Sequence, residues 1–173
     1  TTPMIGEFVS QVGGNNINLT VLMPAEADPH TYEPAPQDAG AIADADLVFY
    51  TGLKYEPAAL IKLLENSACS AEVLAEVGES VFPIEFKEGD HDDHDEEGHD
   101  DHAGHDHGAY DPHFWFDPNR VAYAAEYIES KLVEFDPSNV SEYEAAGKAY
   151  VNELKGLVSQ VSELISTVPS QNR

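Results

Sequence analysis

Two histidines of this sequence stand in the same local pattern, Asp-Pro-His followed by aromatic residues, at positions 28–30 and 111–113. Proline restricts its own backbone and keeps the residue before it extended, so each histidine is held in place before any ligand binds. A neighbouring carboxylate can accept one ring N–H, which leaves the other ring nitrogen free to bind a metal ion. His30 and His113 are therefore the predicted metal ligands. The alternative is two ordinary loop histidines, and their occurrence as a pair argues against it.

The other six histidines fall in one stretch, residues 91–108, with the sequence HDDHDEEGHDDHAGHDHG. It has no apolar side chain larger than alanine and cannot bury surface, so residues 88–109 are predicted to form a disordered loop. The predicted accessory metal ligands are His91, His94, His99, His102, His105 and His107. Because they lie among carboxylates on a flexible chain, binding there should be weak, shared among several geometries and dependent on pH. The alternative is a solvated acidic tether that binds metal only incidentally.

The composition favours a cation as the partner of this chain. Its 173 residues suit one domain, and 33 acidic residues against 8 basic ones give a net charge of -25. Such a charge repels nucleic acid and anionic membrane surfaces, so neither is expected as a partner. The acidity fits a salt-rich habitat or simply a soluble, self-repelling surface, and both interpretations stay open. Cys69 is the single cysteine, which excludes an intramolecular disulfide, and it is predicted to be a small buried hydrophobe.

Hydrophobic periodicity predicts an alternation of helices and strands. Residues 71–77 fit either a strand or a helical turn, and residues 81–86 are expected to be extended. Helices are expected over residues 3–13, 37–45, 56–66, 118–135 and 138–167, and strands over residues 17–23 and 47–50. This alternation predicts an α/β fold, in which a mostly parallel sheet is flanked by helices and followed by a long backbone helix.

The segments around the two triplets resemble the cluster A-I (cluster 9) solute-binding proteins of zinc and manganese ABC transporters. The matching segments are DPHTYEPAPQD at 28–38, ADLVFYTGL at 45–53 and DPHFWFDP at 111–118. The histidine-rich loop is similar to that of the zinc-type members. The resemblance implies a metal held in a cleft between two α/β lobes that a long helix joins. It also implies that His30 and His113 are the two ligands from the N-terminal lobe.

By the same resemblance, residues 1–136 form the N-terminal metal-binding lobe and residues 137–168 form the long interlobe helix. The C-terminal lobe, which in the family supplies a further His or Glu and an Asp, is expected to be absent, as is the family's first strand. The coordination count agrees, because zinc takes four ligands and only two histidines lie outside the loop. Glu33 or a loop histidine is a candidate to complete the shell.

The function that the resemblance implies is an extracytoplasmic zinc-binding receptor that delivers metal to an ABC transporter permease. It would be periplasmic or extracellular, free or lipid-anchored, and a monomer at full length. Imidazole favours Zn2+ over Mn2+, which prefers oxygen ligands. A manganese-binding receptor of the same family and a periplasmic zinc chaperone or storage protein are the alternatives. An enzyme is not expected, since the sequence has no HExxH, GxSxG or P-loop motif.

Overall fold

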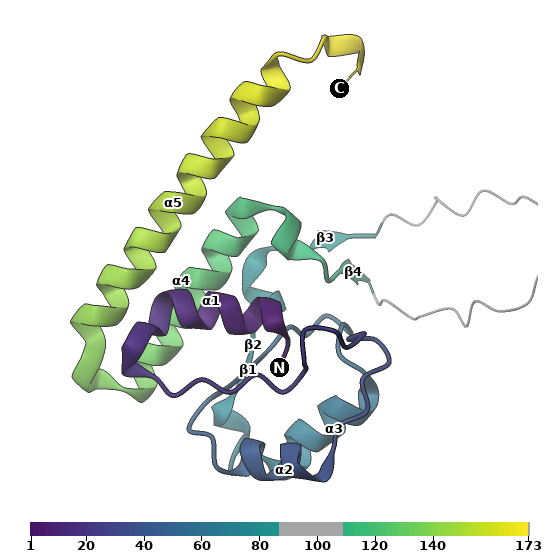
Figure 1. The fold of residues 1–173 in the computed structure, drawn as a ribbon, viewed down its shortest axis with the longest axis vertical. Coiled ribbons are helices and arrows are strands. Elements are labelled where there is room, and N and C mark those ends of the chain that lie inside the picture. Colours follow the sequence, from purple (N-terminus) through teal and green to yellow (C-terminus); the bar gives the residue numbers. More distant parts are fainter. Residues whose placement is uncertain (87–108, 173) are drawn as a thin grey trace, which may run out of the picture.

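The computed structural model describes residues 1–86 and 109–172 and shows an α/β lobe from which one long helix extends (Figure 1). The helices are α1 (Pro3–Gly13), α2 (Pro36–Ala43), α3 (Ala58–Ser67), α4 (Pro118–Phe135) and α5 (Val140–Ser166). The strands are β1 (Val48–Tyr50), β2 (Leu74–Glu76), β3 (Ile84–Glu85) and β4 (Tyr110–Asp111). The predicted fold class is confirmed, and the ambiguous residues 71–77 contain a short 3-10 turn followed by β2.

The strands form two small sheets. β1 and β2 pair in parallel, with Phe49 opposite Ala75, as expected for a sheet whose strands alternate with helices. β3 and β4 pair antiparallel, with Ile84 opposite Asp111, and they bring together the chain on either side of residues 87–108. Because Asp111 opens the second histidine triplet, this triplet begins from a paired strand.

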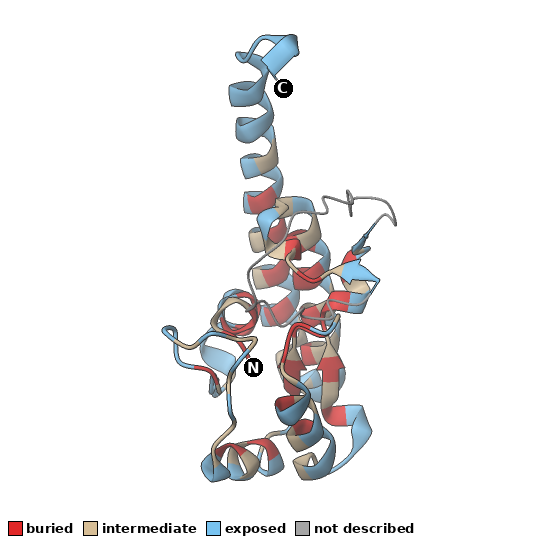
Figure 2. Cartoon of the chain, turned by 90° about the vertical axis from the view of Figure 1, so that its right-hand side faces the viewer, coloured by how far each residue is buried: buried red, intermediate tan, exposed pale blue. Residues whose placement is uncertain are grey.

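The main hydrophobic core lies between α1, α4 and α5, whose apolar residues recur every three or four positions. Its buried members include Ile5, Phe8, Val12, Ala124, Ala125, Ile128, Tyr143 and Val151. A second cluster packs under α2 and α3 and consists of Met23, Ile42, Val48, Leu60 and Leu64. Burial stops part-way along α5, so that its C-terminal half is exposed to solvent (Figure 2).

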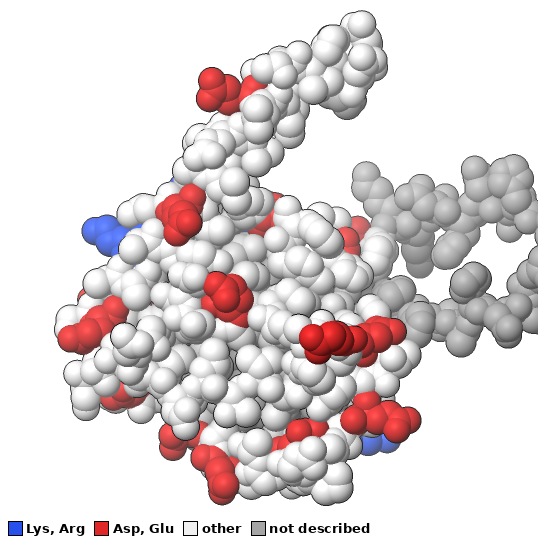
Figure 3. Space-filling view, viewed as in Figure 1, with Lys and Arg blue, Asp and Glu red and all other residues white. Residues whose placement is uncertain are grey.

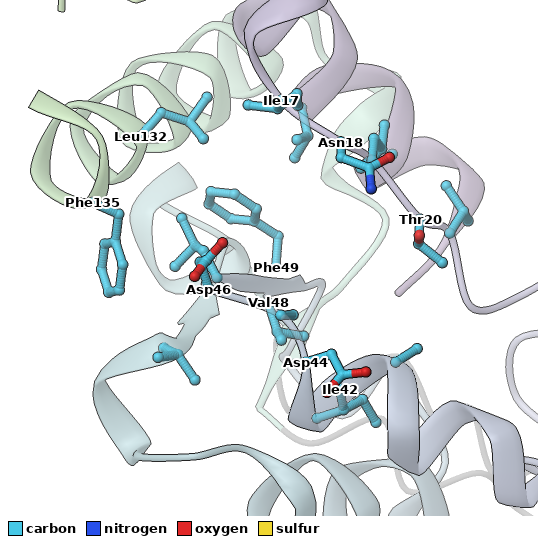
Figure 4. A pocket seen from close by; sticks show the side chains of 18 of the residues that line it. Ile17, Asn18, Thr20, Ile42, Asp44, Asp46, Val48, Phe49, Leu132 and Phe135 are labelled. Atoms are coloured by element: carbon cyan, nitrogen blue, oxygen red, sulfur yellow. The ribbon is translucent and has the colours of Figure 1, made fainter. Parts of the chain in front are cut away.

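The predicted strand over residues 17–23 is wrong. A strand needs a paired neighbour along its length, and here the backbone N–H of Met23 donates to the carbonyl of Thr1 (3.0 Å) at one end of the segment. Residues 17–22 instead border a cavity of about 980 Å³, with β1 on the other side. Figure 4 shows this gap, with Ile17 and Thr20 on one side and Phe49 on the other. Among the residues that the structure describes, no strand therefore pairs with this alternating apolar pattern.

The surface is strongly acidic, as the composition indicated. Asp and Glu side chains are scattered over the face drawn in Figure 3, with few Lys or Arg among them. The prediction that Cys69 is buried is wrong, because it follows the C-terminal end of α3 on an exposed turn. In the ranges that the structure covers, no helix is both long and apolar enough to cross a membrane.

Candidate metal centre

The two Asp-Pro-His triplets fold into the same turn. In each, the aspartate Oδ1 accepts the backbone N–H of the histidine two residues later, at 2.9 Å for Asp28 and His30 and at 2.9 Å for Asp111 and His113. The same Oδ1 of Asp111 also lies 2.7 Å from His113 Nδ1. Because an ionised carboxylate only accepts, Nδ1 carries the proton in this contact. In a neutral ring, Nε2 then presents its lone pair.

The structure brings the two imidazole rings together. The centroids of His30 and His113 lie 6.2 Å apart. Two imidazoles that bind one zinc ion at about 2.0–2.1 Å hold their centroids roughly 5 Å apart, so the observed separation is about 1 Å larger than in such a site. Tyr55 lies 5.0 Å from His30 and 5.7 Å from His113, and Trp115 lies 5.3 Å from His113. Both histidines stay partly exposed, so an ion can approach them.

The segment after His30 is anchored by a buried carboxylate. Asp38, which is 7% exposed, accepts from the Tyr32 hydroxyl (2.8 Å) and from the backbone N–H of Ala35 (2.7 Å). Burial and then Asp38 raise the pKa of Tyr32 to about 12, so the hydroxyl stays protonated and keeps donating. Because Ala35 is the residue before α2 and Asp38 lies in its first turn, the start of α2 holds the loop that carries the first triplet.

The second triplet is held between β4 and α4. Phe114, which is 3% exposed, packs into the main core against α1. Asp117 caps α4 by accepting the backbone N–H of Asn119 (2.9 Å). Burial alone would raise the pKa of Asp117, but hydrogen bonds from the first turn of α4 outweigh burial and lower it. His113 therefore lies on a turn that is fastened on both sides.

Tyr55 reaches the histidines from a turn after β1 whose role the sequence did not reveal. Three consecutive residues there have positive φ: Gly52 (76°), Leu53 (53°) and Lys54 (61°). This region suits glycine and is unfavourable for the other two residues. A Cβ at Gly52 would also lie 1.9 Å from Oε1 of Glu76, so only glycine fits this position.

Two carboxylates hold this turn by accepting its backbone N–H groups. Glu56 accepts from Thr51 (2.6 Å) and Gly52 (2.9 Å), although its own side chain is only 4% exposed. Glu76 accepts from Leu53 (3.0 Å). The available signal was the polar stretch TGLKYE directly after a buried strand, since ligand sites in α/β folds gather at the carboxyl ends of parallel strands.

In the described part of the chain, the two imidazoles would be an incomplete set of ligands for a metal ion. Within residues 1–86 and 109–172, no group of three or more His, Cys, Asp or Glu side chains is placed to hold one metal ion. Glu33, a predicted candidate, is exposed and joins no such group. The six predicted accessory histidines at positions 91–107 lie outside the described residues. The two imidazoles alone would therefore give a zinc ion half of its usual four ligands.

The matching relatives include substrate-binding lipoproteins of metal ABC transporters, a class of receptors and not of enzymes, and a solved ZnuA structure shares the fold. The chain belongs to the family described as zinc-uptake complex component A, periplasmic (ZnuA), whose sequence model matches residues 1–173. The resemblance drawn from the histidine triplets is thereby confirmed at the level of the family.

Relatives match nearly all of this chain. The manganese-binding lipoprotein MntA of Halalkalibacterium halodurans is 29% identical over 170 residues, which cover 98% of this chain and 50% of that protein. The zinc-binding lipoprotein AdcA of Streptococcus pneumoniae is 32% identical over 163 residues, covering 92% and 31%. A crystal structure of ZnuA matches with a TM-score of 0.75 and 27% identity, covering 95% of this chain and 57% of that one. The chain thus spans about half the length of the first curated relatives it matches.

The names of these relatives agree that they are lipoproteins and differ on the metal. One is called manganese-binding and another zinc-binding, and both are called lipoproteins. The family description is periplasmic, which confirms the predicted extracytoplasmic location. Family membership therefore supports a metal ion as the ligand, and the choice between zinc and manganese has to come from coordination chemistry.

Proposed function

We propose that this chain is the metal-receiving lobe of an extracytoplasmic receptor that delivers zinc to an ABC transporter permease. The observation that supports this most directly is the pair of imidazoles, His30 and His113, with ring centroids 6.2 Å apart. Both donors are nitrogens, and imidazole suits zinc better than manganese, which prefers oxygen. The acidic surface adds a field that attracts cations.

The proposal assigns residues 1–136 to the N-terminal lobe and residues 137–168 to an interlobe helix, with the remaining ligands on a C-terminal lobe. The incomplete shell supports this division, because two imidazoles fill half of a tetrahedral zinc site. The exposed C-terminal half of α5 (Figure 2) also supports it, because Leu157, Val161 and Leu164 expose apolar side chains there. The partner would be the membrane permease, and attachment would be by a lipid, as the names of the relatives suggest.

The histidine-rich loop, residues 88–109, is assigned an accessory role in this proposal. Its six histidines would capture zinc weakly and pass it to the pair. Replacing all six histidines between positions 91 and 107 by serine gives a variant, the six-serine background, in which only the pair remains. If the chain were instead a storage or chaperone protein that binds through the loop, this background would bind no zinc.

Calorimetric titration of zinc into the six-serine background tests the pair. We expect one site that binds more weakly than a complete four-ligand shell and that is lost in both His30→Ala and His113→Ala. Glu144→Gln, an exposed change on α5, serves as the control and should leave the site unchanged. A tight one-site isotherm would refute the half-site interpretation, and binding that survives both histidine changes would refute the assignment of the ligands.

Manganese is the second candidate, favoured by relatives such as MntA that are named for it. A competition titration with zinc and manganese at equal concentration discriminates between the two. With nitrogen donors in the pair, we expect zinc to bind and manganese to fail to displace it. Preference for manganese would point to oxygen ligands dominating the complete site.

A further inference from the structure

Tyr55 is a buried tyrosine beside the two histidines, and the proposed binding of a metal ion by these histidines does not itself involve Tyr55. It is 5% exposed, and its ring meets three other rings of the candidate metal centre edge to face. The interplanar angle is 72° with His30 and 87° with His113. The contact with Trp115 has a centroid distance of 5.0 Å and an angle of 71°. Edge-to-face contacts at such distances are favourable and directional, so Tyr55 limits how both imidazoles can turn.

The turn that carries Tyr55 is costly to build. Leu53 and Lys54 both adopt positive φ, which side chains rarely tolerate, and such strain persists only where the surroundings enforce it. Glu76 accepts the backbone N–H of Leu53 itself (3.0 Å), and Glu56, which is 4% exposed, accepts the N–H groups of the two residues before Leu53. The backbone N–H of Tyr55 then closes the turn on the carbonyl of Gly52 (2.9 Å). Backbone strain of this kind concentrates at functional sites. In this protein, the strained turn places the ring of Tyr55 beside the two histidines.

We infer that Tyr55 is a positioning residue that sets the separation and orientation of His30 and His113 for one metal ion. This inference rests on the proposed function. The ring lies against both imidazoles, 5.0 Å from one and 5.7 Å from the other, and so it fixes each relative to the other before the ion arrives. The ring is the acting group, and the hydroxyl is not required.

Three variants in the six-serine background test this inference by calorimetry with zinc. Tyr55→Ala removes the ring and is expected to weaken zinc binding about tenfold, the size of effect seen when groups that orient metal ligands are removed. Tyr55→Phe keeps the ring and should restore most of the affinity. Tyr143→Ala is the matched control, since Tyr143 is also buried but lies at the start of α5, where its hydroxyl donates to Asp136. It should lower the melting temperature without changing zinc affinity.

A spectroscopic measurement separates positioning from general loss of structure. Cobalt(II) added in place of zinc reports ligand geometry through its visible absorption. We expect Tyr55→Ala to change the cobalt spectrum. Tyr143→Ala and Tyr55→Phe should keep the spectrum of the six-serine background. Melting curves without metal show whether each variant folds. Equal losses in Tyr55→Phe and Tyr55→Ala would overturn the inference, because the hydroxyl would then be the acting group.

The possible failures are distinguishable. If zinc binding depends on both histidines but Tyr55→Ala binds zinc as tightly as the six-serine background does, only the positioning role of Tyr55 is refuted. If the chain shows no zinc binding that depends on His30 and His113, the proposed function and this inference are refuted together.

Discussion

The two histidine triplets have the same three residues and the same backbone hydrogen bond, but they are anchored differently. The first lies in the irregular, proline-rich segment 24–35 and is held from a distance through Asp38 at the start of α2. The second lies directly between β4 and α4 and has Phe114 in the main core. A local motif therefore specifies a turn, whereas the rigidity of that turn depends on what packs against the residues that flank it in the sequence.

The largest effect is expected from removing the core anchor of the second triplet. Phe114→Ala leaves a cavity in the main core, so the free energy of unfolding should fall by about 3–5 kcal/mol. Urea unfolding measures this loss. Phe116→Ala is the control, because that ring is 81% exposed and its removal should change stability by less than about 0.5 kcal/mol. Equal effects of the two changes would show that the second triplet is not anchored through the core.

A smaller loss is expected from removing the anchor of the first triplet. Asp38→Ala leaves the Ala35 N–H without its acceptor and leaves the Tyr32 hydroxyl only the carbonyl of Leu22 (3.2 Å), at a cost of about 2 kcal/mol of stability. Zinc affinity in the six-serine background should also fall, because the loop that carries His30 is released. Asp44→Ala, an exposed change after the C-terminal end of α2, is the control. Unchanged zinc affinity in Asp38→Ala would mean that the first triplet holds itself.

The carboxylates of the two triplets provide a direct test of their difference. Asp111→Asn replaces the charge that faces His113 Nδ1 with a neutral amide, and zinc affinity should fall about tenfold, or about 1.4 kcal/mol. Asp28→Asn is the matched change in the first triplet, where the amide oxygen can still accept the backbone N–H of His30. Calorimetry on both variants in the six-serine background compares the two losses of affinity. Unchanged affinity in Asp111→Asn would show that this carboxylate does not orient His113.

The smallest effect is expected at alkaline pH and concerns only the first triplet. The pKa of Tyr32 is raised to about 12, above its ordinary value of 10.0. A group with a raised folded-state pKa contributes stability that is full below pH 10 and is lost as the pH rises toward 12. Because Tyr32 is partly exposed, the loss at pH 11 should stay below about 1 kcal/mol. Urea unfolding at pH 9 and pH 11 should show a larger drop for the unchanged chain than for Tyr32→Phe, which cannot ionise.

Local sequence determined most of the helices and both histidine turns. The helix α4 begins at Pro118 and ends at Phe135, as the hydrophobic periodicity predicted. The two triplets form the same turn because the aspartate and proline act within three residues of the histidine, and no distant partner is needed. These features depend on contacts between residues close in the chain, which is why a single sequence is enough to predict them.

Contacts between distant segments were decided only by the tertiary structure. Residues 17–23 carry a strand pattern, but a strand forms only with a neighbour, and most of this segment borders a cavity instead. Tyr55 was not among the predicted site residues, and packing placed its ring against both imidazoles. His30 and His113 are 83 positions apart in the sequence, and this separation does not predict the 6.2 Å between their ring centroids. That distance depends on how the two anchored turns pack against each other in the folded lobe.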